Sequence, residues 1–159
     1  MRSIYTLAAI FSLTACTPDP PSDEKLTKVF MANERRFVEA EQLCFTRKDI
    51  RSISLESNKY RVRTETGEGT LSQIEENQIT GFLRDMALLQ MNCLWLYSEG
   101  HGKLVHVSFS AYATGLSVSG RSKSIDHVFL ADKAWENEAA KRGELRALPK
   151  EGWFIYEPQ

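Results

Sequence analysis

The sequence predicts an α+β fold, an antiparallel β-meander packed on one face by two main helices. Up to residue 93, apolar residues recur every three to four positions in two long segments, as on one face of a helix. From residue 94 onward they alternate with polar residues, as in strands that bury one face. The composition is 42% apolar, which argues against disorder and suits a single core.

The first helix is expected from Ser22 to Cys44, with charged residues between its apolar positions. Ser22 or Asp23 suits the N-cap. The apolar stripe consists of Leu26, Val29, Phe30, Phe37, Val38 and Cys44. A hairpin follows, because residues 53–55 and 60–62 alternate around a polar Ser-Asn-Lys turn. We expect Gly67-Glu68-Gly69 to end that unit.

A short helical turn is expected at residues 71–76, where Ser72 and Glu75 have the spacing of a capping box. A stronger helix is expected from Thr80, a plausible cap, to Cys93. Its stripe is Phe82, Met86, Leu89 and Cys93. This places Cys93 on the core-facing side of a second helix, as Cys44 is on the first.

The rest of the chain predicts four strands, at residues 94–97, 104–109, 115–118 and 125–130, separated by polar turns. A short charged helix at 132–141 and a closing strand at 153–156 complete the fold. The aromatic residues of this half are interpreted as core more readily than as a ligand platform. They are Trp95, Tyr97, Tyr112, Trp135, Trp153 and Tyr156.

The N-terminus has the parts of an export signal: Arg2, about ten mostly apolar residues up to residue 13, then Thr14 and Ala15 before Cys16. Ten helical residues rise about 15 Å, half of the hydrocarbon core of a bilayer, so they do not span it. The run Leu13-Thr14-Ala15-Cys16 resembles the lipobox of bacterial lipoprotein precursors. The alternative is an ordinary secretory signal in which a Cys happens to follow Ala.

The resemblance implies that residues 1–15 are removed and that Cys16 becomes a lipidated N-terminus, anchoring the protein in a membrane. Thr17, where an Asp would signal retention in the inner membrane, favours the outer membrane, with the domain facing the periplasm. Residues 16–23 contain three prolines and form an extended tether, and 24–159 form a single domain. The mature domain resembles small proteobacterial envelope lipoproteins of unknown function.

With Cys16 carrying lipid, Cys44 and Cys93 remain as an even pair in an oxidising compartment, and we expect a disulfide between them. It would join the C-terminal ends of two packed helices. The alternatives are two separately buried thiols and, less favoured, a metal site, since neither Cys has a Cys or His within four residues.

No catalytic, cofactor or metal motif is found. His101, His106 and His127 have no metal-ligand spacing, and Asp126 and His127, as neighbours in a strand, point to opposite faces. Removal of residues 1–15 would leave 19 of the 20 basic side chains and all 21 acidic ones. The basic residues do not form a stripe, which argues against nucleic acid as a partner.

The segment from Gly115 to Ser124 is the most distinctive local run. Its Arg121 and Lys123 are able to hold a carboxylate or phosphate. The plainer interpretation is a serine-rich strand leading into a polar turn. With Trp135, these two residues are the expected partner contacts.

The leading hypothesis is a non-enzymatic, lipid-anchored module that binds an envelope protein. Such a module either neutralises a toxin or hydrolase, as immunity proteins and inhibitors do, or assists envelope assembly. The alternative is an envelope hydrolase with a dispersed active site that includes a His or a carboxylate. The partner and the oligomeric state do not follow from the sequence.

Overall fold

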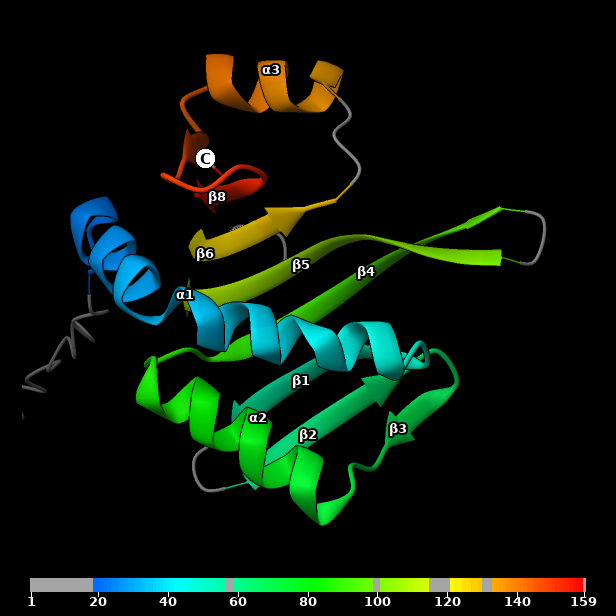
Figure 1. Ribbon diagram of the computed structural model, residues 1–159. Coiled ribbons are helices and arrows are strands. Elements are labelled where there is room, and N and C mark those ends of the chain that lie inside the picture. The colour runs from blue at the N-terminus through cyan, green and yellow to red at the C-terminus, as the bar shows by residue number, and fades with distance from the viewer. Residues whose placement is uncertain (1–18, 57–58, 99–100, 115–120, 130–132, 159) are drawn as a thin grey trace, which may run out of the picture.

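The computed structural model describes residues 19–56, 59–98, 101–114, 121–129 and 133–158 (Figure 1). Its helices are α1 (Asp23–Thr46), α2 (Gln73–Asp85) and α3 (Lys133–Lys141). Its strands are β1 (Ile50–Glu56), β2 (Lys59–Thr64), β3 (Gly67–Gly69), β4 (Gln90–Ser98), β5 (His101–Thr114), β6 (Arg121–Val128), β7 (Leu145–Ala147) and β8 (Trp153–Tyr156). The expected α+β class is confirmed. The strand expected at 115–118 lies outside the described residues, as does Cys16.

The strands form one antiparallel sheet in the order β3-β2-β1-β4-β5-β6-β8-β7. Helices α1 and α2 lie side by side across one face of it, and α3 lies beyond β8 at the opposite end from β3 (Figure 1). The central meander is β4-β5-β6, and α2 is inserted between the hairpin β1-β2 and β4. The prediction that two main helices pack on one face of the sheet is therefore confirmed for α1 and α2.

Helix α1 begins as expected, because Ser22 Oγ accepts the N–H of Lys25 at 3.2 Å. It bends at Asn33, whose backbone is non-helical (φ −133°, ψ 18°) and whose side-chain amide donates to the carbonyl of Val29. The two halves therefore follow the sheet, and Phe30 before the bend and Phe37 after it are both fully buried.

The core is centred on the ring of Phe37. This ring lies 5.1 Å from those of Phe82 in α2 and Phe109 in β5, edge to face in both cases. Trp153 in β8 lies 6.0 Å away and is also fully buried. Each of the four rings comes from a different element, so the cluster joins both helices to the middle of the sheet.

Helix α2 corrects two expectations. The capping box of Ser72 and Glu75 is present, but it begins one helix that runs from Gln73 to Asp85, and Thr80 is inside it rather than at its start. The helix then ends well before Cys93. Ala87 adopts φ 54°, and the N–H of Leu88 donates to the carbonyl of Leu83 at 2.8 Å, the pattern of a Schellman motif without its usual glycine.

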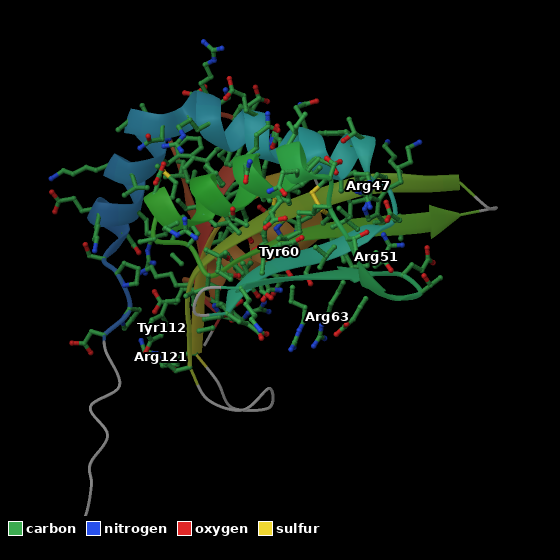
Figure 2. The ribbon with its side chains drawn as sticks, turned by 90° about the horizontal axis from the view of Figure 1, so that it is seen from below. Arg47, Arg51, Tyr60, Arg63, Tyr112 and Arg121 are labelled. Atoms are coloured by element: carbon green, nitrogen blue, oxygen red, sulfur yellow. A yellow bond between two sulfur atoms is a disulfide. The ribbon has the colours of Figure 1, made fainter. Side chains whose placement is uncertain are left out.

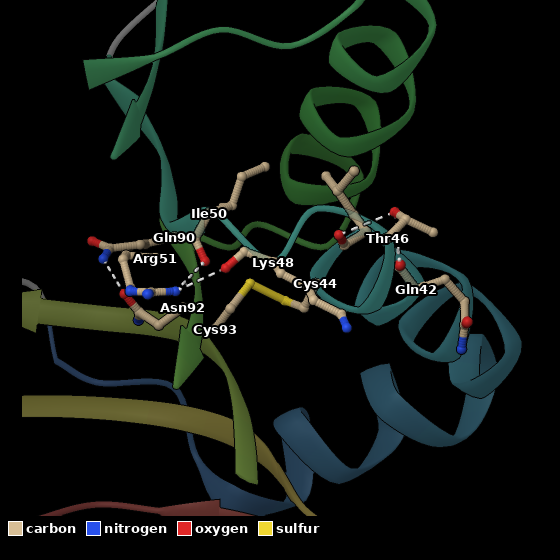
Figure 3. Close-up of a disulfide and its surroundings, with 10 residues drawn as sticks. Gln42, Cys44, Thr46, Lys48, Ile50, Arg51, Gln90, Asn92 and Cys93 are labelled. Atoms are coloured by element: carbon tan, nitrogen blue, oxygen red, sulfur yellow. Dashed lines mark hydrogen bonds between the residues drawn. A yellow bond between two sulfur atoms is a disulfide. The ribbon is translucent and has the colours of Figure 1, made fainter. Parts of the chain in front are cut away.

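The Cys44–Cys93 disulfide is present, but it joins a helix to a strand (Figure 3). Cys44 is in the last turn of α1, and Cys93 is in β4, where its side chain shares the helix-facing side of the sheet with Met91. The expectation that two helix ends are joined is wrong because the spacing that favoured a helix up to Cys93 continues into a strand.

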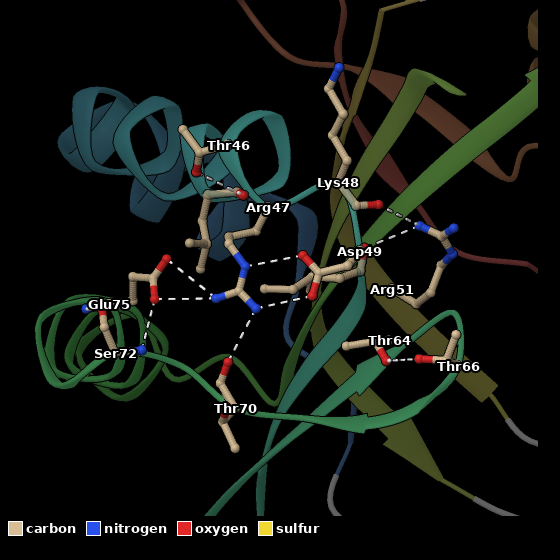
Figure 4. Close-up of polar contacts among 12 residues, drawn as sticks. Thr46, Arg47, Lys48, Asp49, Arg51, Thr64, Thr66, Thr70, Ser72 and Glu75 are labelled. Atoms are coloured by element: carbon tan, nitrogen blue, oxygen red, sulfur yellow. Dashed lines mark hydrogen bonds and ion pairs between the residues drawn. The ribbon is translucent and has the colours of Figure 1, made fainter. Parts of the chain in front are cut away.

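Arg47, just after α1, holds three segments together (Figure 4). Its guanidinium makes two hydrogen bonds of 3.0 Å to the carboxylate of Asp49, and lies 3.3 Å from Glu75 Oε2 at the start of α2. It also donates to the carbonyl of Thr70 at 3.2 Å. The hydrogen bond from Arg47 lowers the pKa of Asp49, and hydrogen bonds from the backbone and side chain of Ser72, with help from Arg47, lower the pKa of Glu75.

The segment Gly67–Gly69, expected to end the β1-β2 unit, instead forms the edge strand β3. Gly67, Glu68 and Gly69 pair with Thr64, Arg63 and Val62. Two glycines weaken the signal for a strand, because glycine has no side chain to pack on a sheet. The hairpin itself is confirmed, as are α3 and the closing strand β8.

Candidate functional site

The sheet has a second face, turned away from α1 and α2, which we call the open face. Alternation along each strand defines it. Ile53, Val62, Met91 and Phe109 are buried against the helices, so their immediate neighbours in each strand project to the other side. Figure 2 shows Arg63 pointing away from the helices on this side.

The register of the strands aligns these outward side chains in two polar rows from β2 to β5. One row is Arg63, Ser52, Asn92 and Ser108, and the other is Arg61, Ser54, Gln90 and Ser110. The serines and amides are half-buried, and both arginines are exposed. Neighbouring strands are about 4.8 Å apart, so the rows form a closely spaced array of hydroxyl and amide groups with a cationic end.

The cationic end of the polar rows is only partly neutralised. Arg61 lies 3.1 Å from Glu56, and Lys59 is exposed beside it. Gln90 and Asn92 hydrogen-bond to each other within the rows. Glu68 lies across from Arg63 in the register of β2 and β3. The open face is therefore rich in hydrogen-bonding groups, and its cationic end keeps a small excess of positive charge, which suits a polar partner that carries carboxylates.

At the other end of the rows, His106 and Asp126 lie in contact. His106 Nε2 is 2.9 Å from Asp126 Oδ2, and the Asp126 side chain is almost entirely buried. Asp126 is the strand partner of Ser108. His127 faces the helices instead, where its Nδ1 lies 2.7 Å from Glu41 Oε2 of α1.

The sequence correctly separates Asp126 from His127, but the two His–carboxylate contacts were not predicted. Each contact joins residues from different elements, and the His127–Glu41 pair is 86 positions apart. The side chain of His101 lies outside the described part of the structure. In the described part of the chain, no three His, Cys, Asp or Glu side chains gather as a metal ion would require.

The expectation that Lys123 contacts a partner is wrong. Its side chain is 6% exposed, and its ammonium lies 2.5 Å from Asp23 Oδ1 and 2.9 Å from Glu157 Oε2. β5 carries an extra residue at Ala111 opposite β6, and alternation along β6 turns Lys123 toward the first turn of α1. The cation thus holds a carboxylate as expected, but both carboxylates belong to its own chain.

Charge pairing changes the titration of this cluster. Burial lowers the pKa of Lys123, but hydrogen bonds to Asp23 and Glu157 outweigh burial, and the pKa ends above its ordinary value. The same hydrogen bond from Lys123 lowers the pKa of Glu157. Arg146 lies 2.8 Å from Asp23, so the start of α1 is fastened to β6, β7 and the C-terminal segment.

Arg121 and Trp135 are the other two residues expected to contact a partner. Arg121 is exposed, with Nη2 3.3 Å from Glu157 Oε1, and remains able to meet a partner. Trp135 is in α3, but its side chain is outside the described part of the structure, as are residues 115–120. Of the aromatic set, Trp153 is fully buried and Tyr112 nearly so, in agreement with a role in the core.

A groove of about 680 Å³ runs between α1 and α2 on the helical side. Its floor includes Leu43 and Phe82, and Arg36 crosses one end to pair with Asp85 at 2.7 Å. Nothing in the structure indicates an occupant. The open face offers more aligned polar groups and is the stronger candidate.

Comparison with known proteins adds no relationship: no protein-family model, curated protein or solved structure matches the chain. Within the described ranges, none of the helices is both long and apolar enough to cross a membrane.

Proposed function

We propose that this chain is a lipid-anchored, periplasm-facing envelope protein that binds another protein through the open face. The two polar rows carry the proposal. They align hydroxyl and amide groups that can hydrogen-bond to a partner, and they end in two arginines, a residue that is enriched in protein interfaces. The cationic end formed by Lys59, Arg61 and Arg63 favours a partner with an acidic surface, since opposite potentials speed association.

Anchoring through Cys16, in the outer membrane, is the second part of the proposal. It is supported by the lipobox-like run and by the proline-rich segment before Asp23, where α1 begins. Metabolic labelling with radioactive palmitate tests it directly. We expect the label on the wild-type chain and none on Cys16→Ser, and label on both chains would contradict lipidation at Cys16.

Site-specific photocrosslinking tests the binding face. A benzoylphenylalanine at Ser54 or Ser108 samples the polar rows, and one at Gln78, exposed on α2, is the matched control on the opposite face. We expect one crosslinked protein from Ser54 and Ser108 and none from Gln78. Arg63→Glu should reduce the yield by slowing association. Crosslinks from Gln78 alone would overturn the assignment of the face.

The alternative function is an envelope hydrolase, favoured by the contact between His106 and the buried Asp126. A carboxylate that holds an imidazole is part of many acid–base sites. A panel of envelope substrates tested with the purified protein should show no activity under our proposal. Activity that disappears in His106→Gln would replace it with the hydrolase.

A further inference from the structure

Strand β4 extends beyond the residues of β1 with which it pairs. The pairing of β1 with β4 ends at Ser52 and Asn92, whereas β4 continues to Ser98 and remains paired with β5 as far as His101. The resulting β4-β5 ribbon projects beyond the sheet (Figure 1). Within the described ranges, no strand is paired with the outer edge of β4 from residue 93 to residue 98, which we call the overhang.

The backbone of the overhang presents hydrogen-bonding groups on that edge. The N–H of Leu55 in β1 donates to the carbonyl of Leu89 at 2.9 Å, and Met91 is the strand partner of Ile53. In an antiparallel pair every second residue directs both backbone groups to the same neighbour. The odd-numbered residues of β4 therefore face β1, and along the overhang Trp95 and Tyr97 direct their N–H and C=O groups to the side where β1 has ended.

The two true edges of the sheet are protected, and the overhang is not. Edge strands β3 and β7 have three residues each, with a charged residue at the centre, Glu68 in one and Arg146 in the other. Short length and charge are the features that block unwanted strand pairing. The overhang, Cys-Leu-Trp-Leu-Tyr-Ser, contains neither a charge nor a proline.

Two leucines make the overhang a specific surface. Leu94 is 55% and Leu96 60% exposed, and alternation places both on the open face next to the polar rows. Trp95 points the other way and packs against the core. A strand added beside the overhang would cover these two side chains with its own, as cross-strand neighbours in a sheet do.

We propose that the partner protein adds a strand to the overhang, by means of an extended segment with apolar residues at alternate positions. This inference rests on the proposed protein-binding function and names its recognition mode. The disulfide holds the end of α1 over Cys93, at the base of the overhang (Figure 3). Beyond Cys93, the described part of the chain contains no strand paired with this edge of β4 that an added strand would have to displace.

The probe is a library of random twelve-residue peptides displayed on phage and selected against the detergent-solubilised full chain. We expect enriched peptides to alternate apolar and polar residues. A synthetic copy of one should slow amide hydrogen exchange at Trp95 and Tyr97 at least tenfold. It should bind Leu94→Lys and Leu96→Lys at least tenfold more weakly than wild type. Ile74→Lys, which changes a 70% exposed apolar residue of α2, is the matched control and should bind normally.

Three results would overturn strand addition: no enriched peptide, binding that Leu96→Lys leaves unchanged, or slowed exchange outside β4. A dimer in sedimentation that Leu96→Lys abolishes would assign the overhang to a second copy of the chain instead. Because both leucines are exposed, circular dichroism should show unchanged folding in the lysine variants. A photocrosslinked partner that binds Leu96→Lys as well as wild type would refute strand addition alone and leave the open face intact.

Discussion

The disulfide between Cys44 and Cys93 should supply a large part of the stability of the fold. The two residues are 49 positions apart, and closing a loop of that length removes about 4 kcal/mol of chain entropy from the unfolded state. Domains of this size are stable by about 5–15 kcal/mol in total. Without the disulfide about 1–11 kcal/mol would remain, so we expect the reduced protein to stay folded at 25 °C with a much smaller margin of stability.

Urea unfolding of the oxidised and the fully reduced wild-type chain measures this contribution. Comparing redox states keeps both sulfur atoms in place, so no cavity is created, unlike in the Cys44→Ala/Cys93→Ala double variant. With an unfolding entropy of about 0.3 kcal/mol/K for a folded region of about 140 residues, a loss of 4 kcal/mol lowers Tm by about 14 °C.

The location of the bond adds a kinetic expectation. Cys44 is fully buried and Cys93 is 2% exposed, so a reductant reaches the sulfur atoms only when the structure opens. Reduction should be slow in buffer and fast in urea. A difference below about 1 kcal/mol between the redox states, or Cys44 and Cys93 thiols that react with a thiol reagent in the unfolded oxidised chain, would refute the reasoning.

Three further perturbations test separate parts of the structure. Ala87→Gly should raise the free energy of unfolding by about 1 kcal/mol, because φ 54° strains alanine and not glycine; an unchanged or lowered urea midpoint would contradict the αL cap. Stability should fall with pH below about 4, since Asp49, Glu75 and Glu157 have lowered pKa values and their contributions, complete above the unfolded pKa, are lost as they protonate. In urea titrations from pH 6 to pH 3, Glu157→Gln should be less stable than wild type at pH 6 and depend less on pH; parallel curves would count against its pairing with Lys123. Glu41→Ala should cost about 1–3 kcal/mol, because it leaves the half-buried His127 without its Nδ1 partner; calorimetry showing no change in Tm would show that the contact is not stabilising.

The sequence correctly predicted the helix starts that are fixed by a capping side chain close by in the chain. Ser22 and the pair Ser72–Glu75 cap helices because their side chains reach backbone N–H groups within three residues. The end of α2 could not be predicted from the sequence. Ala87 adopts the left-handed conformation that ends the helix, and this position is usually occupied by a glycine. Without a glycine to indicate the end of the helix, the sequence predicted that the helix continues to Cys93, which is in fact in strand β4.

Burial of Lys123 required information that the local pattern lacks. Alternation along β6 puts Lys123 on the same side as the buried Ile125, and its partners Asp23 and Glu157 come from the two ends of the fold. A lysine between serines is typical of a solvated strand. Only the positions of α1 and of the C-terminal segment beside β6 turn it into the centre of an ion-pair cluster.

The open face shows where sequence reasoning could have gone further. Its components are visible as alternating pairs of small polar residues, Ser52 with Ser54, Gln90 with Asn92, and Ser108 with Ser110. Alternation alone predicts that each pair shares the solvent side of its strand. What aligns the pairs is the strand order, in which β4 lies beside β1 although α2 separates them in the chain. The overhang has a separate origin, because β1 pairs with β4 only from Ser52 onward, soon after the chain has left the end of α1. A partner that uses both the rows and the overhang would contact one continuous surface, with hydrogen bonds along the rows and apolar burial at Leu94 and Leu96.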